Sequence, residues 1–388
     1  MKSLFFLAAL LLQSFYSFGT DPIRVNNAQF PRLFANERGQ PVMSWVERTS
    51  QAVALVYRIS PDGGLTFREP VRILLPGTTA AHGEDVPKLI FKGDGTRMVV
   101  YSLPKPMPDA TRAGNLLYQL SRDGKTWSAA RPVHRDTTAG KSHSYAEMTR
   151  LPNGEIGLIW LDDKLPGREG RTVRFTQTLP TGGFGAEVII DSSACPCCRP
   201  GIAVDGRGRI YLTYRDLLPG GTRDISFVVS ADGGQSFSQP KTLGDDRWNV
   251  NACPHSGPQL VAQGELVYAT WYSGAAGREG VRMARLDQPD QPALLPGAHR
   301  TPPQLGSGGA NRMALAWEEM VGEAPDGYRQ VMVRMTSETG GRQTVPVSTP
   351  GELTSLPVLL SADTGLLVAY QVWMGQESQV VLKRIPFF

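Results

Sequence analysis

The sequence predicts an all-β fold, a β-propeller of four-stranded antiparallel blades, from three observations. Short turn segments of nearly the same sequence occur three times, apolar strand starts recur along the chain, and the two ends of the chain complement each other. The strand starts recur at about 50 residues, which is typical of one propeller blade. Glycine and proline are abundant, with 42 and 30 of 388 residues, as expected where turns separate many short strands.

The three turn segments are residues 60–67, 121–127 and 230–237. Each reads Ser-x-Asp, then glycine, then threonine or serine, then an aromatic residue, and the middle copy is one residue shorter. Aspartate can accept hydrogen bonds from backbone amides across a tight turn, and glycine accepts positive φ. The segments resemble the Asp box of the sialidase-like (BNR-repeat) β-propeller superfamily. Three copies, each after an alternating apolar run, make this resemblance specific.

The recurring strand starts predict seven blades. They lie at residues 30–33, 86–89, 146–149, 199–202, 257–260, 302–305 and 356–359. The last repeat has only three strands before the chain ends, while residues 21–25 have the form of an outer strand with nothing before it. We therefore expect the amino-terminal strand to complete the last blade, which removes the exposed sheet edges. The alternative is six blades, the number implied by the sialidase resemblance.

The amino terminus predicts export. Residues 1–3 are a charged tip and residues 4–12 an apolar run too short to span a bilayer, so residues 1–19 read as a cleaved signal peptide. An uncleaved anchor is the alternative. Residues 20–388 are then a single propeller domain, periplasmic or secreted, without a transmembrane segment and expected to be a monomer. The net charge is only +4, and the absence of a basic stripe excludes nucleic acid as a partner.

One face of the expected propeller gathers the reactive residues. The connections after the second strand of each blade are long, and together with the segments that enter the inner strands they lie on the same face. Long loops on a rigid scaffold are where such folds bind ligands. We expect a small molecule, a glycan or a metal at this channel mouth, and an envelope protein is a further possible partner.

Two neighbouring segments on that face carry cysteine and histidine at matching positions. Cys195 and Cys253 are equivalent relative to a shared proline, and so are Cys197 and His255. In an exported protein, an even number of cysteines favours disulfides, joining Cys195 or Cys197 to Cys253 and pairing the remaining two. The alternative is a soft-metal site for copper or zinc. Its candidate ligands are Cys195, Cys197, Cys198, Cys253, His255 and His143.

The sialidase resemblance also implies an alternative activity. Enzymes of that family hold a substrate carboxylate with three arginines and use a tyrosine–glutamate pair with an aspartate as acid/base. The early Arg-x-Pro of the family is missing, because residues 31–32 have the reverse order. Weak catalytic candidates are Asp85, Tyr145, Glu147, Arg199, Arg223 and Arg278.

The sequence thus favours an exported, non-catalytic or atypical ligand-binding propeller with a Cys/His-rich site on the loop face, where copper or zinc binding is the alternative to disulfides. The first alternative is an exo-α-sialidase-type glycoside hydrolase with divergent catalytic residues. The second is a platform for protein interaction. Five aromatic residues of the second strands are interpreted as hydrophobic core between neighbouring blades, not as a surface on which sugar rings stack. They are Trp45, Trp160, Tyr214, Trp271 and Trp317.

Overall fold

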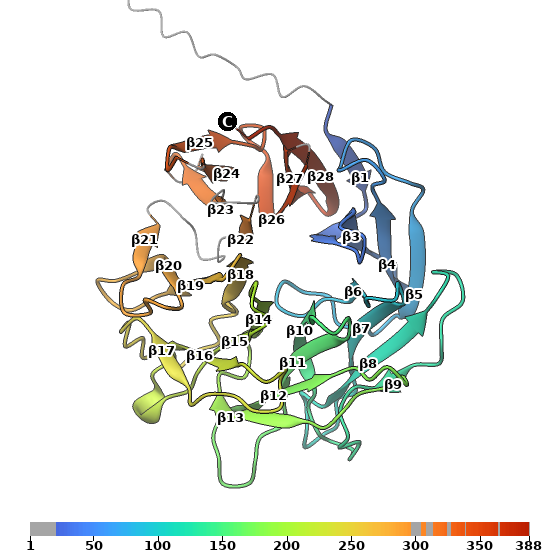
Figure 1. Ribbon diagram of the computed structural model, residues 1–388, viewed down its shortest axis with the longest axis vertical. Coiled ribbons are helices and arrows are strands. Elements are labelled where there is room, and N and C mark those ends of the chain that lie inside the picture. The colour runs from blue at the N-terminus through green and yellow to red at the C-terminus, as the bar shows by residue number, and fades with distance from the viewer. Residues whose placement is uncertain are drawn as a thin grey trace, which may run out of the picture.

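The computed structural model describes residues 21–295, 304–307, 313–323, 327–337, 339–363 and 365–387. These residues form seven four-stranded antiparallel sheets arranged as a ring (Figure 1). The prediction of seven blades is confirmed, and the six-bladed alternative is wrong. Residues 1–19, the expected signal peptide, and residues 302–303 of the sixth strand start lie outside the described residues.

The first three blades follow one another along the chain. Blade one contains β2 (Gln29–Ala35), β3 (Pro41–Arg48), β4 (Ala52–Ile59) and β5 (Val71–Pro76). Blade two contains β6 (Lys88–Phe91), β7 (Arg97–Pro104), β8 (Gly114–Ser121) and β9 (Arg131–Pro132). Blade three contains β10 (Ser144–Arg150), β11 (Ile156–Asp162), β12 (Arg171–Gln177) and β13 (Val188–Ala194).

The remaining blades repeat the same order from the inner strand to the outer one. Blade four contains β14 (Gly201–Val204), β15 (Ile210–Arg215), β16 (Ile225–Ser230) and β17 (Lys241–Leu243). Blade five contains β18 (Gln259–Gln263), β19 (Leu266–Ser273), β20 (Gly280–Arg285) and β21 (Ala293–Leu295). Blade six contains β22 (Gln304–Ser307), β23 (Met313–Val321), β24 (Tyr328–Thr336) and β25 (Arg342–Pro346). Blade seven contains β26 (Leu353–Ala362), β27 (Gly365–Met374), β28 (Glu377–Ile385) and β1 (Ile23–Asn26).

Strand β1 closes the ring as expected. It pairs antiparallel with β28, with Ile23 opposite Leu382 and Asn26 opposite Gln379. The first strand of the described chain thus supplies the outer strand of the last blade (Figure 1). Because the backbone groups of β28 are paired on both sides, this strand leaves no open edge.

Each Asp-box segment forms the turn between the third and fourth strands of its blade. In the first copy Ser60 Oγ donates to Asp62 Oδ1 at 2.9 Å, and the amide of Gly64 donates to Ser60 Oγ at 2.7 Å. The amide of Thr66 donates to the same aspartate at 2.8 Å. The other two copies make the equivalent bonds. The predicted role of the aspartate is confirmed, and the serine adds an acceptor for the glycine amide.

The hydrophobic core lies between the blades. Buried side chains form one cluster at each of the seven junctions between neighbouring blades, including the junction of blade seven with blade one. The five second-strand aromatic residues belong to these clusters and are at most 3% exposed, as predicted. Their side-chain N–H or O–H groups all donate to carboxylates; for example, Trp45 Nε1 donates to Glu47 at 2.9 Å.

The described strands are connected by turns and loops, with one three-residue 3₁₀ helix, Pro219–Gly221, among them. Within the part of the chain that the structure describes, no helix combines the length and the apolar character needed to cross a bilayer.

Candidate metal centre at the channel mouth

The cysteines lie in the two segments that lead from an outer strand to the next inner strand. Cys195, Cys197 and Cys198 follow β13 and precede β14, and Cys253 and His255 lie between β17 and β18. The amide of Cys195 donates to the carbonyl of Arg215 at 2.9 Å, which joins the first segment to the second strand of blade four. The predicted convergence of these segments is present in the structure.

Glu84, from blade two, holds the two segments side by side. Its Oε2 atom accepts hydrogen bonds from the amide of Arg199 at 2.8 Å and from the amide of Gly257 at 2.9 Å. A Cβ atom at Gly257 would lie 2.1 Å from the carbonyl oxygen of Arg199. Only glycine therefore permits this close approach of the two backbones.

Three thiols form a buried group, which we call the inner triad: Cys195, Cys197 and Cys198. Each is at most 3% exposed. The Sγ atom of Cys195 lies 3.8 Å from that of Cys197 and 3.7 Å from that of Cys198. A disulfide requires about 2.05 Å between the sulfurs, and all four cysteines of the chain are free thiols in the structure. The disulfides expected from the sequence are absent from this arrangement.

A second group, the outer triad, consists of Cys197, Cys253 and His255. One ligand atom from each lies within 4.8 Å of the other two. Cys253 and His255 are exposed, so this triad opens to solvent. His255 has a φ of +48°, a conformation that costs energy for a non-glycine residue. Backbone strain of this kind is common where a side chain must be aimed at a ligand.

Two guanidinium groups lie beside the inner triad. Arg223 Nη1 donates to Cys195 Sγ at 3.0 Å, and its Nε donates to the carbonyl of Val250 at 2.9 Å. Arg215 is 1% exposed and donates to the carbonyls of Ser256, Tyr272 and Arg223. Among the described residues neither arginine forms an ion pair with a carboxylate.

The charge on the inner triad is unequally distributed. The hydrogen bonds that join Cys195 to Cys197 and Cys198 lower the pKa of Cys195, and the charge of Arg223 acts in the same direction. The hydrogen bond to Cys195 raises the pKa of Cys197. Burial raises the pKa of Cys198 to about 12. Of the three thiols, Cys195 is thus the one whose surroundings favour the thiolate form.

A hollow of about 620 Å³ adjoins the outer triad. Its wall includes Cys197, Cys253 and His255 together with His82, Tyr145 and Arg171. Arg171 is buried and donates to Ser144 Oγ at 2.8 Å and to the carbonyl of Ser142 at 2.7 Å. Burial lowers the pKa of Arg171 to about 10. The hollow thus places a cationic, partly aromatic wall next to the candidate metal ligands.

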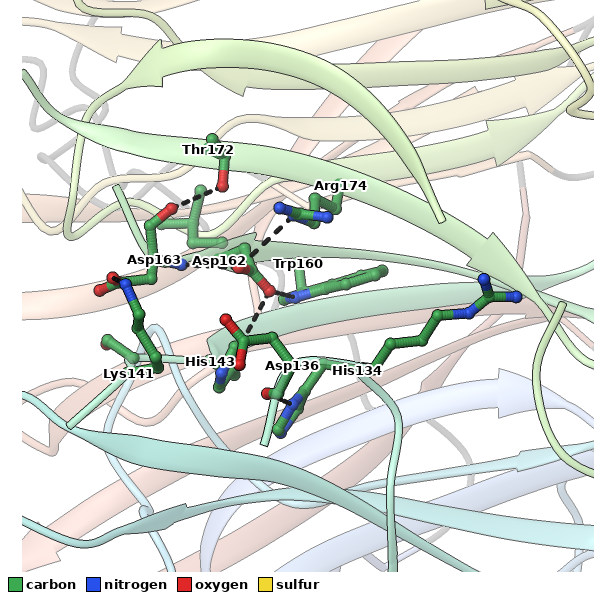
Figure 2. A network of polar contacts seen from close by, with 12 residues as sticks. His134, Asp136, Lys141, His143, Trp160, Asp162, Asp163, Thr172 and Arg174 are labelled. Carbon is green, nitrogen blue, oxygen red and sulfur yellow. Dashed lines mark hydrogen bonds and ion pairs between the residues drawn. The ribbon is translucent and has the colours of Figure 1, made fainter. Parts of the chain in front are cut away.

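The expected ligand His143 has a different environment (Figure 2). Its Nδ1 lies 2.7 Å from Asp162 Oδ2, which also accepts the indole N–H of Trp160 at 2.7 Å. The ring of His143 stacks on that of His134, with centroids 3.5 Å apart and planes 6° from parallel. Burial and the neighbouring His143 lower the pKa of His134. His143 lines the hollow but belongs to neither triad.

Glu147, one of the weak catalytic candidates, is surrounded by cations. Arg32 Nη2 lies 2.9 Å from Glu147 Oε1, Arg199 Nη1 bonds Oε2, and Lys88 Nζ lies 3.8 Å from Oε2. Burial raises the pKa of Glu147, but these three charges outweigh it and hold the pKa well below its usual range. Burial lowers the pKa of Lys88 to about 8. Glu147 is therefore the ionised centre of a buried ion cluster at neutral pH.

Of the other catalytic candidates, Asp85 and Tyr145 are neighbours in the wall of the hollow, whereas Arg223 and Arg278 do not line it. Asp85 is buried and accepts a hydrogen bond from Ser102 at 3.0 Å, and burial raises its pKa. Burial and the nearby Asp85 raise the pKa of Tyr145 to about 12. Among the hydrogen bonds of the described residues, none joins Tyr145 to Glu147. Arg223 contacts Cys195, and Arg278 is exposed and donates to the carbonyl of Asp245 at 2.5 Å.

Sequence reasoning missed three features of this face: the hydrogen bonds of Glu84, the position of Arg215, and the stacking of His134 on His143. Glu84 carries no sequence signal, because its partners lie 115 and 173 residues away. Arg215 could have been noticed as a charged residue at the end of an otherwise apolar strand. His134 lies in the same strand-entry segment as His143, between β9 and β10, and the stacking of the two rings depends on how this segment folds.

These observations define the class of the protein: a seven-bladed Asp-box β-propeller with a cluster of free thiols at the channel mouth. No protein-family model and no curated protein matches the sequence. In fold, the chain is similar to the polysaccharide lyase Uly1, with a TM-score of 0.55, 10% identity, and coverage of 92% of this chain and 90% of that one.

Two further solved structures share the propeller ring. The BP39L lectin from Burkholderia pseudomallei has a TM-score of 0.53 at 12% identity, covering 94% of this chain and 97% of the lectin. The intramolecular trans-sialidase from Ruminococcus gnavus has a TM-score of 0.47 at 11% identity, covering 92% and 94%. Identities this low concern the fold alone, and of these three structures the two with a TM-score above 0.5 are those of the lyase and the lectin.

Proposed function

We propose that this protein binds a soft metal ion, Cu(I), at the mouth of its propeller channel. The observation that carries the proposal is the outer triad, in which Cys197 and two residues of the neighbouring blade, Cys253 and His255, bring three ligand atoms within 4.8 Å of one another. Thiolate and imidazole are the ligands that Cu(I) prefers in proteins. Export to the periplasm or beyond, expected from residues 1–19, is part of the proposal.

The donor set favours Cu(I) over Zn(II). A structural zinc site is almost always tetrahedral with four protein ligands, whereas the outer triad offers two sulfurs and one nitrogen. Bound metal would also account for free thiols in an exported protein, where unprotected cysteines are oxidised to disulfides. The approach of the two segments is fixed by Glu84 and Gly257, so little order would be lost when the ion binds.

The experiment measures Cu(I) affinity under anaerobic conditions by competition with a chromophoric Cu(I) chelator. For Cys253→Ser and His255→Ala we expect weaker binding by at least about tenfold, since even the outer partners of metal ligands contribute about 10–100-fold to affinity. His82→Ala, which changes a histidine of the same hollow outside both triads, is the matched control and keeps wild-type affinity. Equal affinity of all four proteins would overturn the proposal, and Zn(II) is titrated in parallel.

The hollow supports a second candidate, binding of a glycan or small anionic ligand beside the metal. Its supporting observation is that Tyr145 and exposed Arg112 both line the hollow. The solved structures of similar fold include a polysaccharide lyase and a lectin. A glycan array probed with the purified protein tests this candidate, and release of a fluorophore from a sialoside tests the sialidase alternative. Signals unchanged by Arg112→Ala would remove the hollow as the binding place.

A further inference from the structure

The two triads share one residue. Cys197 belongs to the buried group with Cys195 and Cys198 and also to the exposed group with Cys253 and His255. A thiolate sulfur has several lone pairs and can bind two soft ions at once. The position of Cys197 between the two groups is therefore that of a bridging ligand.

The inner triad has the dimensions of a three-coordinate site. An ion held about 2.3 Å from each of three sulfurs, in their plane, places those sulfurs about 4 Å apart. The observed distances from Cys195 Sγ are 3.8 Å to Cys197 and 3.7 Å to Cys198. All three side chains are buried, so water is excluded from the position that an ion would take.

Charge balance gives an independent argument. Arg223 donates to Cys195 Sγ and Arg215 to the carbonyl of Ser256, next to His255, and no ion pair among the described residues joins either arginine to a carboxylate. A buried cation needs a compensating charge, because removing it from water is costly. The charges of four thiolates, two Cu(I) ions and two guanidinium groups sum to zero. A pair of neutral disulfides would leave both arginines uncompensated.

We propose that the channel mouth holds two Cu(I) ions bridged by the thiolate of Cys197. One ion occupies the inner triad, and the other is bound by Cys197, Cys253 and His255. This inference rests on the proposed function and extends it to a second, buried ion. Copper remains Cu(I) throughout, the thiol protons are released to solvent, and no oxidant or reductant takes part.

The test is the Cu(I) stoichiometry of the purified protein, measured by native mass spectrometry after anaerobic loading from a Cu(I) complex. Wild type takes two equivalents. The variant C253S/H255A retains one, in the inner triad, and C195S/C198S retains one, in the outer triad. Cys197→Ser loses both, because it removes a ligand from each ion. The control His82→Ala keeps two.

The outcomes separate the two proposals. Wild type with one equivalent, lost in C253S/H255A, would leave the proposed function standing and overturn the bridged pair. Two equivalents of which Cys197→Ser retains one would also overturn the bridge. No bound copper in wild type would refute both. If Cys197→Ser fails to fold by circular dichroism, X-ray absorption of the loaded wild type decides, since a bridged pair gives a copper–copper scattering path and separated ions do not.

Discussion

Glu84 joins residues that are remote in the sequence, and its effect can be tested directly. Its carboxylate accepts the amides of Arg199 and Gly257, both in a buried environment. Glu84→Ala leaves these two donors without a partner, at about 1–3 kcal/mol each. We expect a clearly lower free energy of unfolding in urea, together with weaker Cu(I) binding, because the two cysteine-bearing segments lose their common acceptor.

Glu84→Gln is the matched variant, since it keeps one oxygen acceptor. It should fall between wild type and Glu84→Ala in both measurements. An unfolding midpoint for Glu84→Ala equal to that of wild type would show that this hydrogen-bonded link does not hold the segments.

Glu147 predicts a pH dependence of stability. Its pKa is lowered in the folded protein by Arg32, Lys88 and Arg199, which outweigh its burial. The stabilisation is therefore complete above the unfolded pKa of about 4.3 and is lost as the pH falls below it. At pH 7, Glu147→Gln should lower the free energy of unfolding by about 3–5 kcal/mol, the typical effect of breaking a buried ion pair.

The check is a series of urea denaturation curves between pH 3 and pH 7. The difference between wild type and Glu147→Gln should be constant down to about pH 5 and shrink below pH 4. A difference that stays the same over the whole range would mean that the ionised carboxylate is not its source.

For single residues, the sequence predicted that the sulfur and imidazole groups converge but did not predict the residues that surround them. The matching offsets of Cys195, Cys197, Cys253 and His255 follow from the blade repeat, so their convergence could be predicted. Whether the thiols form disulfides could not be predicted, because that depends on the distances and orientations of the side chains in the fold. His143 was placed on the correct face, but its hydrogen bond to Asp162 required the strand register.

Among the elements, the Asp-box turns offer a matched pair of glycines. Gly233 and Gly234 both have positive φ, at 73° and 88°. A Cβ at Gly234 would lie 2.6 Å from the ring of Phe175 on the preceding blade, whereas a Cβ at Gly233 meets nothing within 4 Å. The second glycine of the box is therefore required by contact between blades as well as by backbone conformation.

We expect Gly233→Ala to cost about 1–2 kcal/mol, the usual strain of a left-handed alanine. Gly234→Ala adds overpacking against Phe175, about 1–3 kcal/mol more. Thermal unfolding should rank wild type above Gly233→Ala, and Gly233→Ala above Gly234→Ala. Equal melting temperatures for the two variants would show that Phe175 moves away without loss.

The strands and turns could be predicted from the sequence because turn chemistry and strand period are local properties. Residues 60–67, 121–127 and 230–237 form the predicted turns. The inner strands of blades two, four and five begin two residues after the predicted starts, at Lys88, Gly201 and Gln259. The delay has a local reason, since a proline precedes each start and has no amide to donate.

For the whole molecule, ring closure by β1 is the feature with the largest expected effect. Removing residues 21–27 leaves β28 with an unpaired edge and removes Arg24, whose Nη1 donates to Gln379 at 2.7 Å. We expect a lower melting temperature and concentration-dependent self-association, because exposed strand edges pair with other chains. Analytical ultracentrifugation compares the truncated and intact proteins. A truncated protein that remains monomeric with unchanged melting would contradict this role of β1.

Seven blades could be predicted because the order of strands is the same in every repeat. The last repeat lacks one strand and the chain begins with an additional one, so pairing these two parts is the one way to close the ring. The repeats do not determine what function the propeller has. That function depends on segments between blades whose sequences differ, so similar propellers include both a lyase and a lectin.

The most direct test of the account is a joint measurement of metal content and free thiols on protein isolated from its source without chelators. We predict bound copper, with Cys195, Cys197, Cys198 and Cys253 resistant to alkylation until a strong Cu(I) chelator is added and reactive as thiols afterwards. Metal-free protein whose four cysteines are all joined in disulfides would contradict it.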